Sequence, residues 1–309
     1  MLKIIVSRLL STVIVVFGVA CLVFLLIHLV PGDPVDMMLG ENAQMADRES
    51  LREALGLNQS IGAQLLTYFN NLLHGDLGTS LHSRVPVVEM LAERIPATIE
   101  LALVSLLISC LIAFPLGIVA ALNKGKGWDR TAMGVSLLGV SIPNFLLGPV
   151  LILVFSIYLG WLPVSGRNGI DSMILPAITL GTALAAVLSR MIRSTLLEVL
   201  SEDYIRTARA KGSSHVQVVI HHALPNAMLP IITLLGLQLG VLLGGAVITE
   251  TVFSWPGIGK LTIDAIMKRD YPVLQACVLL ISITYVVVNM ITDIVYAWID
   301  PRIRIGGQS

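Results

Sequence analysis

The chain has 309 residues, of which 55% are hydrophobic and only 13% are charged, and its mean hydropathy is +0.85. A soluble domain carries about 25% charged residues, so this chain could not cover a compact water-soluble globule with polar side chains. The composition excludes a cytosolic enzyme, a disordered chain and a nucleic-acid-binding protein. Twenty basic residues balance twenty acidic ones, so no polyanionic partner is implied. The chain is expected to lie in a lipid bilayer.

Apolar runs long enough to cross a bilayer, which takes about 20 helical residues, predict six transmembrane helices. They are expected over residues 9–30, 97–122, 131–159, 174–197, 227–249 and 273–298. The first run is longer than a signal-peptide core and no small-residue cleavage site follows it, so it is predicted to be retained. Prolines 115, 143 and 149 are expected to kink or break their helices.

Basic residues concentrate in the short loops that would share a side with the N-terminus, which predicts that both termini are cytoplasmic. These residues include Lys124, Lys126, Arg130, Arg190, Arg193, Arg206, Arg209 and Lys211. The expected fold class is therefore an all-α membrane protein; the resemblance described below implies that its membrane is the bacterial cytoplasmic (inner) membrane. Its expected segments are an N-terminal helix (1–30), an extracytoplasmic helical segment (31–96), a core with five transmembrane helices (97–299) and a cytoplasmic tail (300–309). In the extracytoplasmic segment, one apolar face predicts a helix over 61–73, and a second helix is expected over 47–55.

The cytoplasmic loop 198–226 is punctuated like two short helices joined by a turn. Ser201 is a candidate N-cap, Gly212 can adopt the left-handed conformation that ends a helix, and Ser214 can cap a second helix over 215–224. Pro225 is expected to stop that helix. Two interpretations remain open from physics alone: a hairpin that only shields the end of the bundle, and a rigid docking element that passes force into both attached spans.

The sequence DYIRTARAKG over 203–212, followed by HALPNA over 222–227, resembles the EAA loop of ABC importer permeases. Arg206, Thr207 and Ala208 occupy the place of Glu-Ala-Ala, and His222 replaces an isoleucine, in the form usual for the branch serving dipeptides, oligopeptides and nickel. The resemblance implies an ATPase-coupling role for Asp203, Tyr204, Arg206, Thr207, Ala208, Arg209, Lys211, Gly212, Leu224 and Pro225.

Further motifs resemble the same branch along nearly the whole chain, and their order makes them specific. They are HLVPGDP (28–34), GDLGTS (75–80), PATIEL (96–101), SIPNF (141–145), WPGIG (255–259), RDYPV (269–273) and DPR (300–302). The resemblance is to the first-permease (dipeptide permease B-like) members, and it implies the type I (MetI-like) importer permease fold. It also implies a homologous second permease, two cytoplasmic ABC ATPases and an extracytoplasmic substrate-binding protein as partners.

The function implied by this resemblance is a non-catalytic permease subunit for di- and oligopeptides, with ATP and Mg²⁺ bound by the partner ATPases and no cofactor bound by this chain. Nickel complexes, glutathione or oligosaccharides are alternative cargoes. The sequence agrees with a non-catalytic role, since it has no phosphate-binding loop, HExxH or nucleophile elbow. The three cysteines show no metal-ligand spacing.

Polar and small residues within the spans suggest packing and path positions. Gly236, Gly240 and Gly244 recur every four residues and are expected to let another helix approach closely. Asn144 and Gln238 are candidates for the translocation path, because polar groups inside a membrane are costly. An ion-coupled secondary transporter is the main rival function, yet it would be expected to carry mid-membrane carboxylates and an inverted repeat.

Overall fold

The computed structural model describes residues 2–29 and 58–299, together with residues 45, 49, 52 and 53 between them. The chain divides into two compact units. The larger unit holds residues 97–260 and the chain from residue 284 onward, and the smaller unit holds residues 2–96 and 261–283. The expected helix over 47–55 and the tail 300–309 lie outside the described residues.

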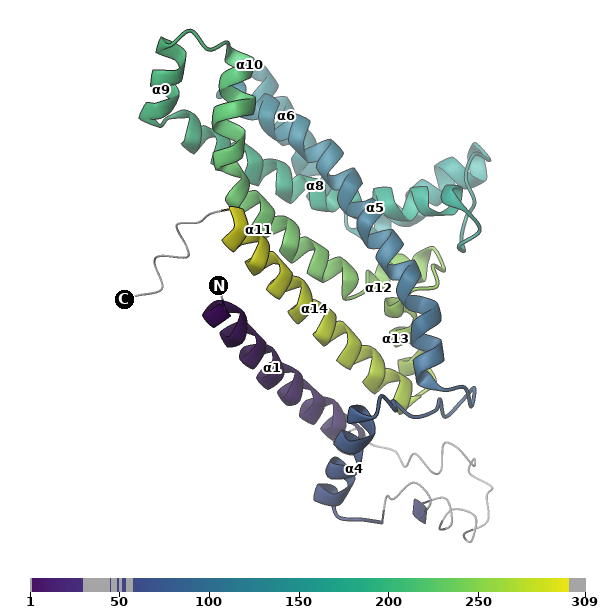
Figure 1. Ribbon diagram of the computed structural model, residues 1–309. Helices are drawn as coiled ribbons and strands as arrows, with labels where there is room; N and C mark the ends of the chain where they lie inside the picture. Colours follow the sequence, from purple (N-terminus) through teal and green to yellow (C-terminus); the bar gives the residue numbers. More distant parts are fainter. Residues whose placement is uncertain (1, 30–44, 46–48, 50–51, 54–57, 300–309) are drawn as a thin grey trace. The chain divides into compact units, whose positions relative to one another are not determined.

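Helices make up almost all the regular structure of the described chain (Figure 1). In chain order they are α1 (Leu2–Leu29), α4 (Ile61–Leu73), α5 (Val87–Leu122), α6 (Gly127–Ser141), α7 (Asn144–Leu151), the π-helix η1 (Ile152–Tyr158), α8 (Ile170–Leu200), α9 (Asp203–Ala210), α10 (His215–Gln217), the π-helix η2 (Val218–Ala223), α11 (Leu224–Leu243), α12 (Val247–Val252), α13 (Ile258–Met267) and α14 (Tyr271–Ile299).

Four stretches of the described chain are long and apolar enough to cross a membrane: Val87–Leu122, Ile170–Leu200, His215–Leu243 and Tyr271–Val295. The predicted third span is instead a pair of helices, Gly127–Ser141 and Asn144–Tyr158, bent by 95°. Counting that pair as one span gives up to five. In α1, Thr12–Leu25 is a shorter apolar helix by the same measure.

The bend follows from Pro143. Proline disfavours helical backbone in the residue before it, and Ile142 is extended, with φ −91° and ψ 112°. Pro149 then lies inside α7, where it removes one helical N–H donor, and the chain continues as the π-helix η1. Pro115 was expected to kink or break its span, but α5 passes through it without interruption.

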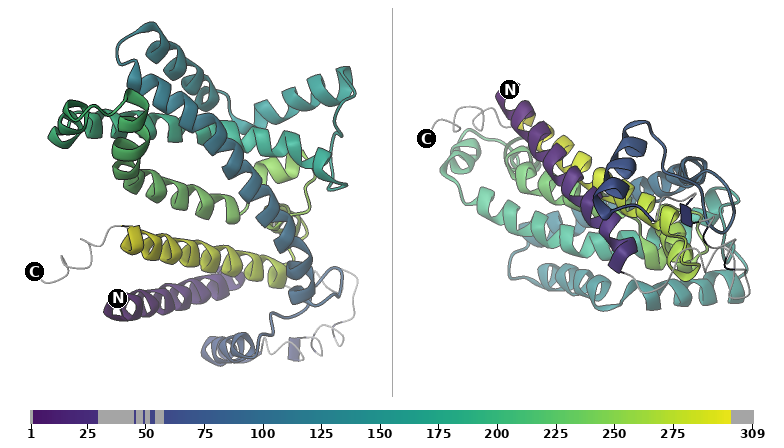
Figure 2. Two further views of the ribbon diagram at one scale, coloured as in Figure 1. Left: turned by 45° about the horizontal axis from the view of Figure 1, so that its top comes forward. Right: turned by 90° about the horizontal axis from the view of Figure 1, so that it is seen from below.

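The core of the larger unit lies on α8, which packs against α6 and α11; Figure 2 shows these helices from two further directions. The fully buried Leu188, Ile192 and Leu196 form one face of α8. They share an apolar cluster with Ala113 of α5 and Ile231 of α11. Between helices in a membrane, close packing of this kind, rather than removal of apolar surface from water, holds the helices together.

The end of α11 differs from the predicted helix over 227–249. The helix ends at Leu243, because Gly245 takes a left-handed φ of +98° and turns the chain into α12. The fully buried Glu250 then accepts hydrogen bonds from the Thr98 hydroxyl at 3.2 Å and the Lys260 backbone N–H at 2.8 Å. The indole of Trp255 donates to the Ala97 carbonyl at 2.8 Å. These bonds fasten the chain after α12 to the start of the 97–122 span.

The smaller unit begins with α1 packed on α4. Phe17 stacks on Phe69 with a centroid distance of 5.0 Å, and Phe24 lies 5.7 Å from Tyr68. The bounds of α4 match the predicted helix over 61–73, and Ser60 caps it by accepting from the Ala63 N–H. Of the apolar and aromatic residues of α4, Phe69 and Tyr68 meet α1, whereas Ile61, Leu66 and Leu73 are largely exposed.

Candidate functional site

The candidate docking site is the hairpin of residues 201–223, which joins α8 to α11 (Figure 1). The prediction that Ser201 caps its first helix is wrong. Ser201 retains helical backbone, and its hydroxyl donates to the Glu198 carbonyl at 2.6 Å, so it closes the end of α8. Glu202 is the N-cap of α9, without a side-chain cap bond.

The turn of the hairpin is a Schellman motif centred on Gly212, whose φ is +87°. The Gly212 N–H donates to the Arg209 carbonyl at 3.0 Å, and the Ser213 N–H donates to the Ala208 carbonyl at 3.2 Å. An added Cβ on Gly212 would meet nothing within 4 Å. The requirement for glycine therefore comes from the backbone conformation alone.

The second half of the hairpin begins as predicted and ends differently. Ser214 and Gln217 form a capping box, with bonds of 3.3 and 2.9 Å between each side chain and the other residue's N–H. Pro225 was expected to stop this helix, but the chain runs on through η2 into α11. The π-turns shift the hydrogen-bond register, and Pro225 falls in the first turn of α11, where a missing N–H costs little.

The inner face of the hairpin is anchored in the core. Ile205 of α9 and Ala223 of η2 are fully buried, and both share an apolar cluster with Leu196 of α8 and Ala227 of α11. The π-helix η2 contacts both α9 and α8. One buried cluster therefore joins the hairpin to both spans that it connects.

The opposite face is polar and exposed. It carries Asp203, Arg206, Thr207, Arg209 and Lys211. Tyr204 is 42% exposed, and its hydroxyl lies 3.5 Å from the carbonyl of His222. Burial of the ring, with a smaller effect from the nearby Glu202 carboxylate, raises the pKa of Tyr204 above its ordinary value, so the hydroxyl stays neutral. The exposed face can thus offer a protein partner both cationic and hydroxyl hydrogen-bond donors and a carboxylate acceptor.

The two predicted path residues both lie close to Leu184. Asn144 lines a pocket of about 340 Å³ in the larger unit, together with Leu184 and Thr249. Gln238 is buried, and its amide Nε2 donates to the Leu184 carbonyl at 3.2 Å. In this chain Gln238 therefore bridges α11 and α8, while the lining of a passage by either residue stays a prediction.

Two of the three predicted packing glycines face α14. A Cβ on Gly236 would overlap the side chain of Thr292, and one on Gly240 would lie 3.1 Å from the ring of Tyr285. Gly244 is the C-cap of α11.

An ion pair that the sequence did not predict joins α6 to α8, the span that enters the hairpin. Arg193 Nε and Nη2 donate to the two carboxylate oxygens of Asp129 at 2.6 and 2.8 Å, and the Gly125 N–H adds a bond of 2.9 Å. Asp129 is buried. In the sequence, the only hint of this ion pair is that Asp129 lies at the start of an apolar run. No group of three potential metal ligands occurs in the part of the chain that the structure describes.

Solved structures share this fold. The inward-facing MetNI methionine ABC transporter matches 69% of this chain and 97% of its own, with a TM-score of 0.60 at 20% identity. An amino acid ABC transporter solved with histidines matches 70% of this chain and 94% of its own, with a TM-score of 0.51 at 16% identity. At these identities the likeness shows the fold alone, which is that of a type I importer permease.

The sequence matches two family models: the binding-protein-dependent transport system inner membrane component over residues 113–305, and the N-terminal part of such membrane components over residues 1–102. The glutathione transport system permease protein GsiC of Escherichia coli (strain K12) is 44% identical over 304 residues, 98% of this chain and 99% of the relative. The protein of that name from Salmonella choleraesuis (strain SC-B67) is 45% identical over the same shares. The chain therefore belongs to the inner membrane components of binding-protein-dependent transport systems, as an ABC importer permease of the peptide and nickel family.

Proposed function

We propose that this permease forms, with a homologous second permease, the passage through which an ATP-driven importer takes up short peptides, including glutathione. A binding protein on the extracytoplasmic side delivers the cargo, and two cytoplasmic ATPases supply the energy. The observation that carries this proposal is the 201–223 hairpin, whose buried face is continuous with two membrane spans.

In this proposal the hairpin is the mechanical link. Closure of the ATPase dimer on ATP moves the exposed face that carries Tyr204 and Arg206. The buried contacts of Ile205 then carry the motion into α8 and α11. Alternating access follows as a largely rigid-body motion of these helices. ATP and Mg²⁺ stay on the partner subunits, and both termini of this chain lie in the cytoplasm.

The substrate class rests on the relatives. Proteins 44–45% identical over 98% of this chain are named as glutathione permeases, and glutathione is a tripeptide. Selection among cargoes is expected to lie mainly with the binding protein. A passage lined by small and amide side chains binds polar cargo weakly, as a conduit must if it is to release its load. Nickel complexes and oligosaccharides are the remaining alternatives.

Reconstitution tests this proposal directly. The permease is purified with its co-expressed partner permease and ATPases, inserted into liposomes with ATP inside, and supplied outside with the binding protein and radiolabelled glutathione, alanyl-alanine or a nickel complex. We expect ATP-dependent accumulation of glutathione or the dipeptide. Accumulation of the nickel complex alone would overturn the peptide assignment. Uptake driven by an ion gradient without ATP would overturn the importer assignment in favour of a secondary transporter.

A further inference from the structure

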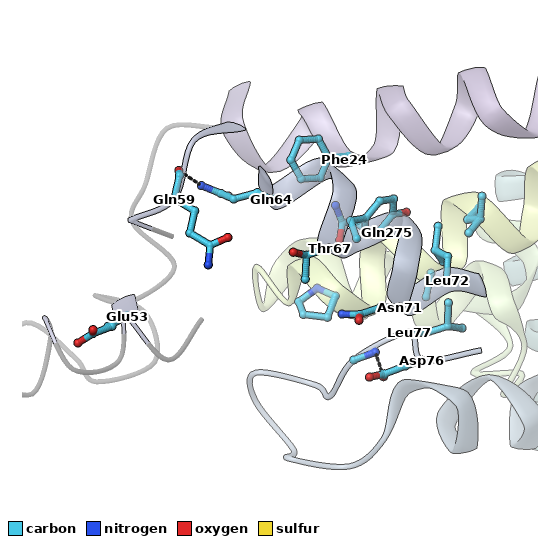
Figure 3. A pocket seen from close by; sticks show the side chains of 15 residues that line it. Phe24, Glu53, Gln59, Gln64, Thr67, Asn71, Leu72, Asp76, Leu77 and Gln275 are labelled. Atoms are coloured by element: carbon cyan, nitrogen blue, oxygen red, sulfur yellow. Dashed lines mark hydrogen bonds between the residues drawn. The ribbon is translucent and has the colours of Figure 1, made fainter. Parts of the chain in front are cut away.

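The smaller unit contains a pocket of about 460 Å³ that the docking hairpin does not use (Figure 3). It lies between α1, α4, the turn around residues 76–78 and the first turns of α14. Pockets of about 300–1,000 Å³ are the usual size for small organic ligands.

The walls of this pocket are fastened together. The buried carboxylate of Asp270 accepts from the Ser80 hydroxyl at 2.5 Å and from the Leu81 N–H at 3.1 Å, which holds the loop after the turn against the start of α14. Gln275 Nε2 donates to the Val23 carbonyl at 3.0 Å and so ties α14 to α1. The pocket thus has walls that are tied together within one unit, and it opens to solvent, since Asn71 and Asp76 are both exposed.

Its lining combines hydrogen-bonding groups, an apolar floor and negative charge. Figure 3 shows Thr67 and Asn71 on α4, with Asp76 close to Asn71 and the apolar Leu72 and Leu77 nearby. Glu53 lies at another edge, and neither lysine nor arginine is among the described lining residues. Asp76 Oδ1 accepts the Gly78 N–H at 2.8 Å. With Glu53 and Asp76 present and no lysine or arginine among its described residues, the lining carries net negative charge.

The aromatic part of the lining adds no charge of its own. Burial, together with the nearby Cys21 thiol, raises the pKa of Tyr68 to about 12, so its hydroxyl is neutral at physiological pH. Phe24 is 5% exposed and packs against Tyr68. Aromatic faces attract cations, and they favour the same kind of ligand as the carboxylates do.

We propose that this pocket binds a primary ammonium group on a small hydrogen-bonding molecule. Asp76 pairs with the ammonium, and the amides of Asn71 and Gln275 bond the polar groups beside it. Two sources carry this chemistry: the free N-terminus of a short peptide, and the ethanolamine headgroup of a membrane phospholipid. The peptide source rests on the proposed function, whereas the lipid source does not.

Two substitutions and a matched control test the site. Asp76→Asn removes the charge but keeps an oxygen to accept the Gly78 N–H, and Asn71→Leu removes an amide from the lining. Asn70→Leu makes the same change at the adjacent exposed residue, which does not line the pocket. All variants are purified with their partner subunits in phosphatidylcholine nanodiscs, without binding protein, and titrated calorimetrically with alanyl-alanine and with N-acetyl-alanyl-alanine.

For the peptide source, wild type and Asn70→Leu should bind alanyl-alanine equally and the acetylated probe at least tenfold more weakly. Loss of one charged hydrogen bond should weaken binding to Asp76→Asn by about fivefold or more. For the lipid source, native mass spectrometry should show phosphatidylethanolamine retained by wild type and lost by Asp76→Asn. The proposal is overturned if Asp76→Asn matches wild type for both the dipeptide and the lipid. ATP-driven uptake, measured separately, decides the proposed function, because probe binding needs neither ATP nor transport.

Discussion

At the scale of single residues, the Asp129–Arg193 pair ties α8, the span that enters the hairpin, to α6. Asp129→Ala leaves a partly buried guanidinium without its partner, and Arg193 is only 28% exposed. We expect a loss of about 2–3 kcal/mol in the free energy of unfolding, somewhat below the range for a fully buried pair. The thermal midpoint of the purified permease in detergent measures this. Arg130→Ala, an exposed neighbour, is the control, and equal midpoints for both variants would contradict the prediction.

Gly236 shows a different kind of residue constraint, the absence of a side chain at a helix contact. Because a Cβ there would overlap Thr292, Gly236→Leu should separate α11 from the second half of α14 and cost about 1–3 kcal/mol. Gly240→Leu should cost less, since its neighbour is a tyrosine ring that can shift. Gly134→Leu, with nothing within 4 Å, is the control. After heating, the recovery of monodisperse protein should be highest for Gly134→Leu, lower for Gly240→Leu and lowest for Gly236→Leu. Any other order would contradict the prediction that these glycines lie at a tight helix contact.

At the scale of elements, the hairpin depends on one backbone conformation. Gly212→Pro imposes a φ near −65° where the chain has +87°, so the Schellman turn cannot form. We expect ATP-driven uptake to fall more than tenfold although the permease still inserts and co-purifies with its ATPases. Gly212→Ala, strained by only about 1–2 kcal/mol, should keep most of the uptake. Normal uptake by a well-expressed Gly212→Pro variant would show that the hairpin does not couple.

The elements also show how far sequence patterns reach. Apolar runs predict the long helices because burial in lipid or protein requires them, and the face of α4 predicts its bounds. Ser201 failed as a predicted cap because a serine hydroxyl serves the end of one helix as well as the start of the next. Pro225 failed as a stop because it lies in the first turn of α11, where a missing N–H costs little. The bonds of Glu250 to Thr98 and of Asp270 to Ser80 join residues 152 and 190 positions apart, which no local pattern reveals.

At the scale of the whole molecule, the two candidate sites lie in different units. The larger unit carries the docking hairpin and the buried α8 core, and the smaller unit carries the amphipathic α4 and its polar pocket. The charge of the short loops predicts that the hairpin faces the cytoplasm and that α4 lies on the extracytoplasmic side. The proposed function therefore requires one particular orientation of the chain.

That orientation is testable with single cysteines. Thr207→Cys on the hairpin and Ser165→Cys in the loop before α8 are both at exposed positions. The native Cys21, Cys110 and Cys277 lie in apolar helices and are half-buried or buried, so background labelling by a charged maleimide should be low. In right-side-out vesicles we expect Ser165→Cys to react and Thr207→Cys to be protected, with the reverse in inverted vesicles. The permease without either substitution, which keeps its three native cysteines, is the control. Labelling of Thr207→Cys from the extracytoplasmic side would place the hairpin where no ATPase could reach it, and the coupling mechanism would then be wrong even though the fold and family stand.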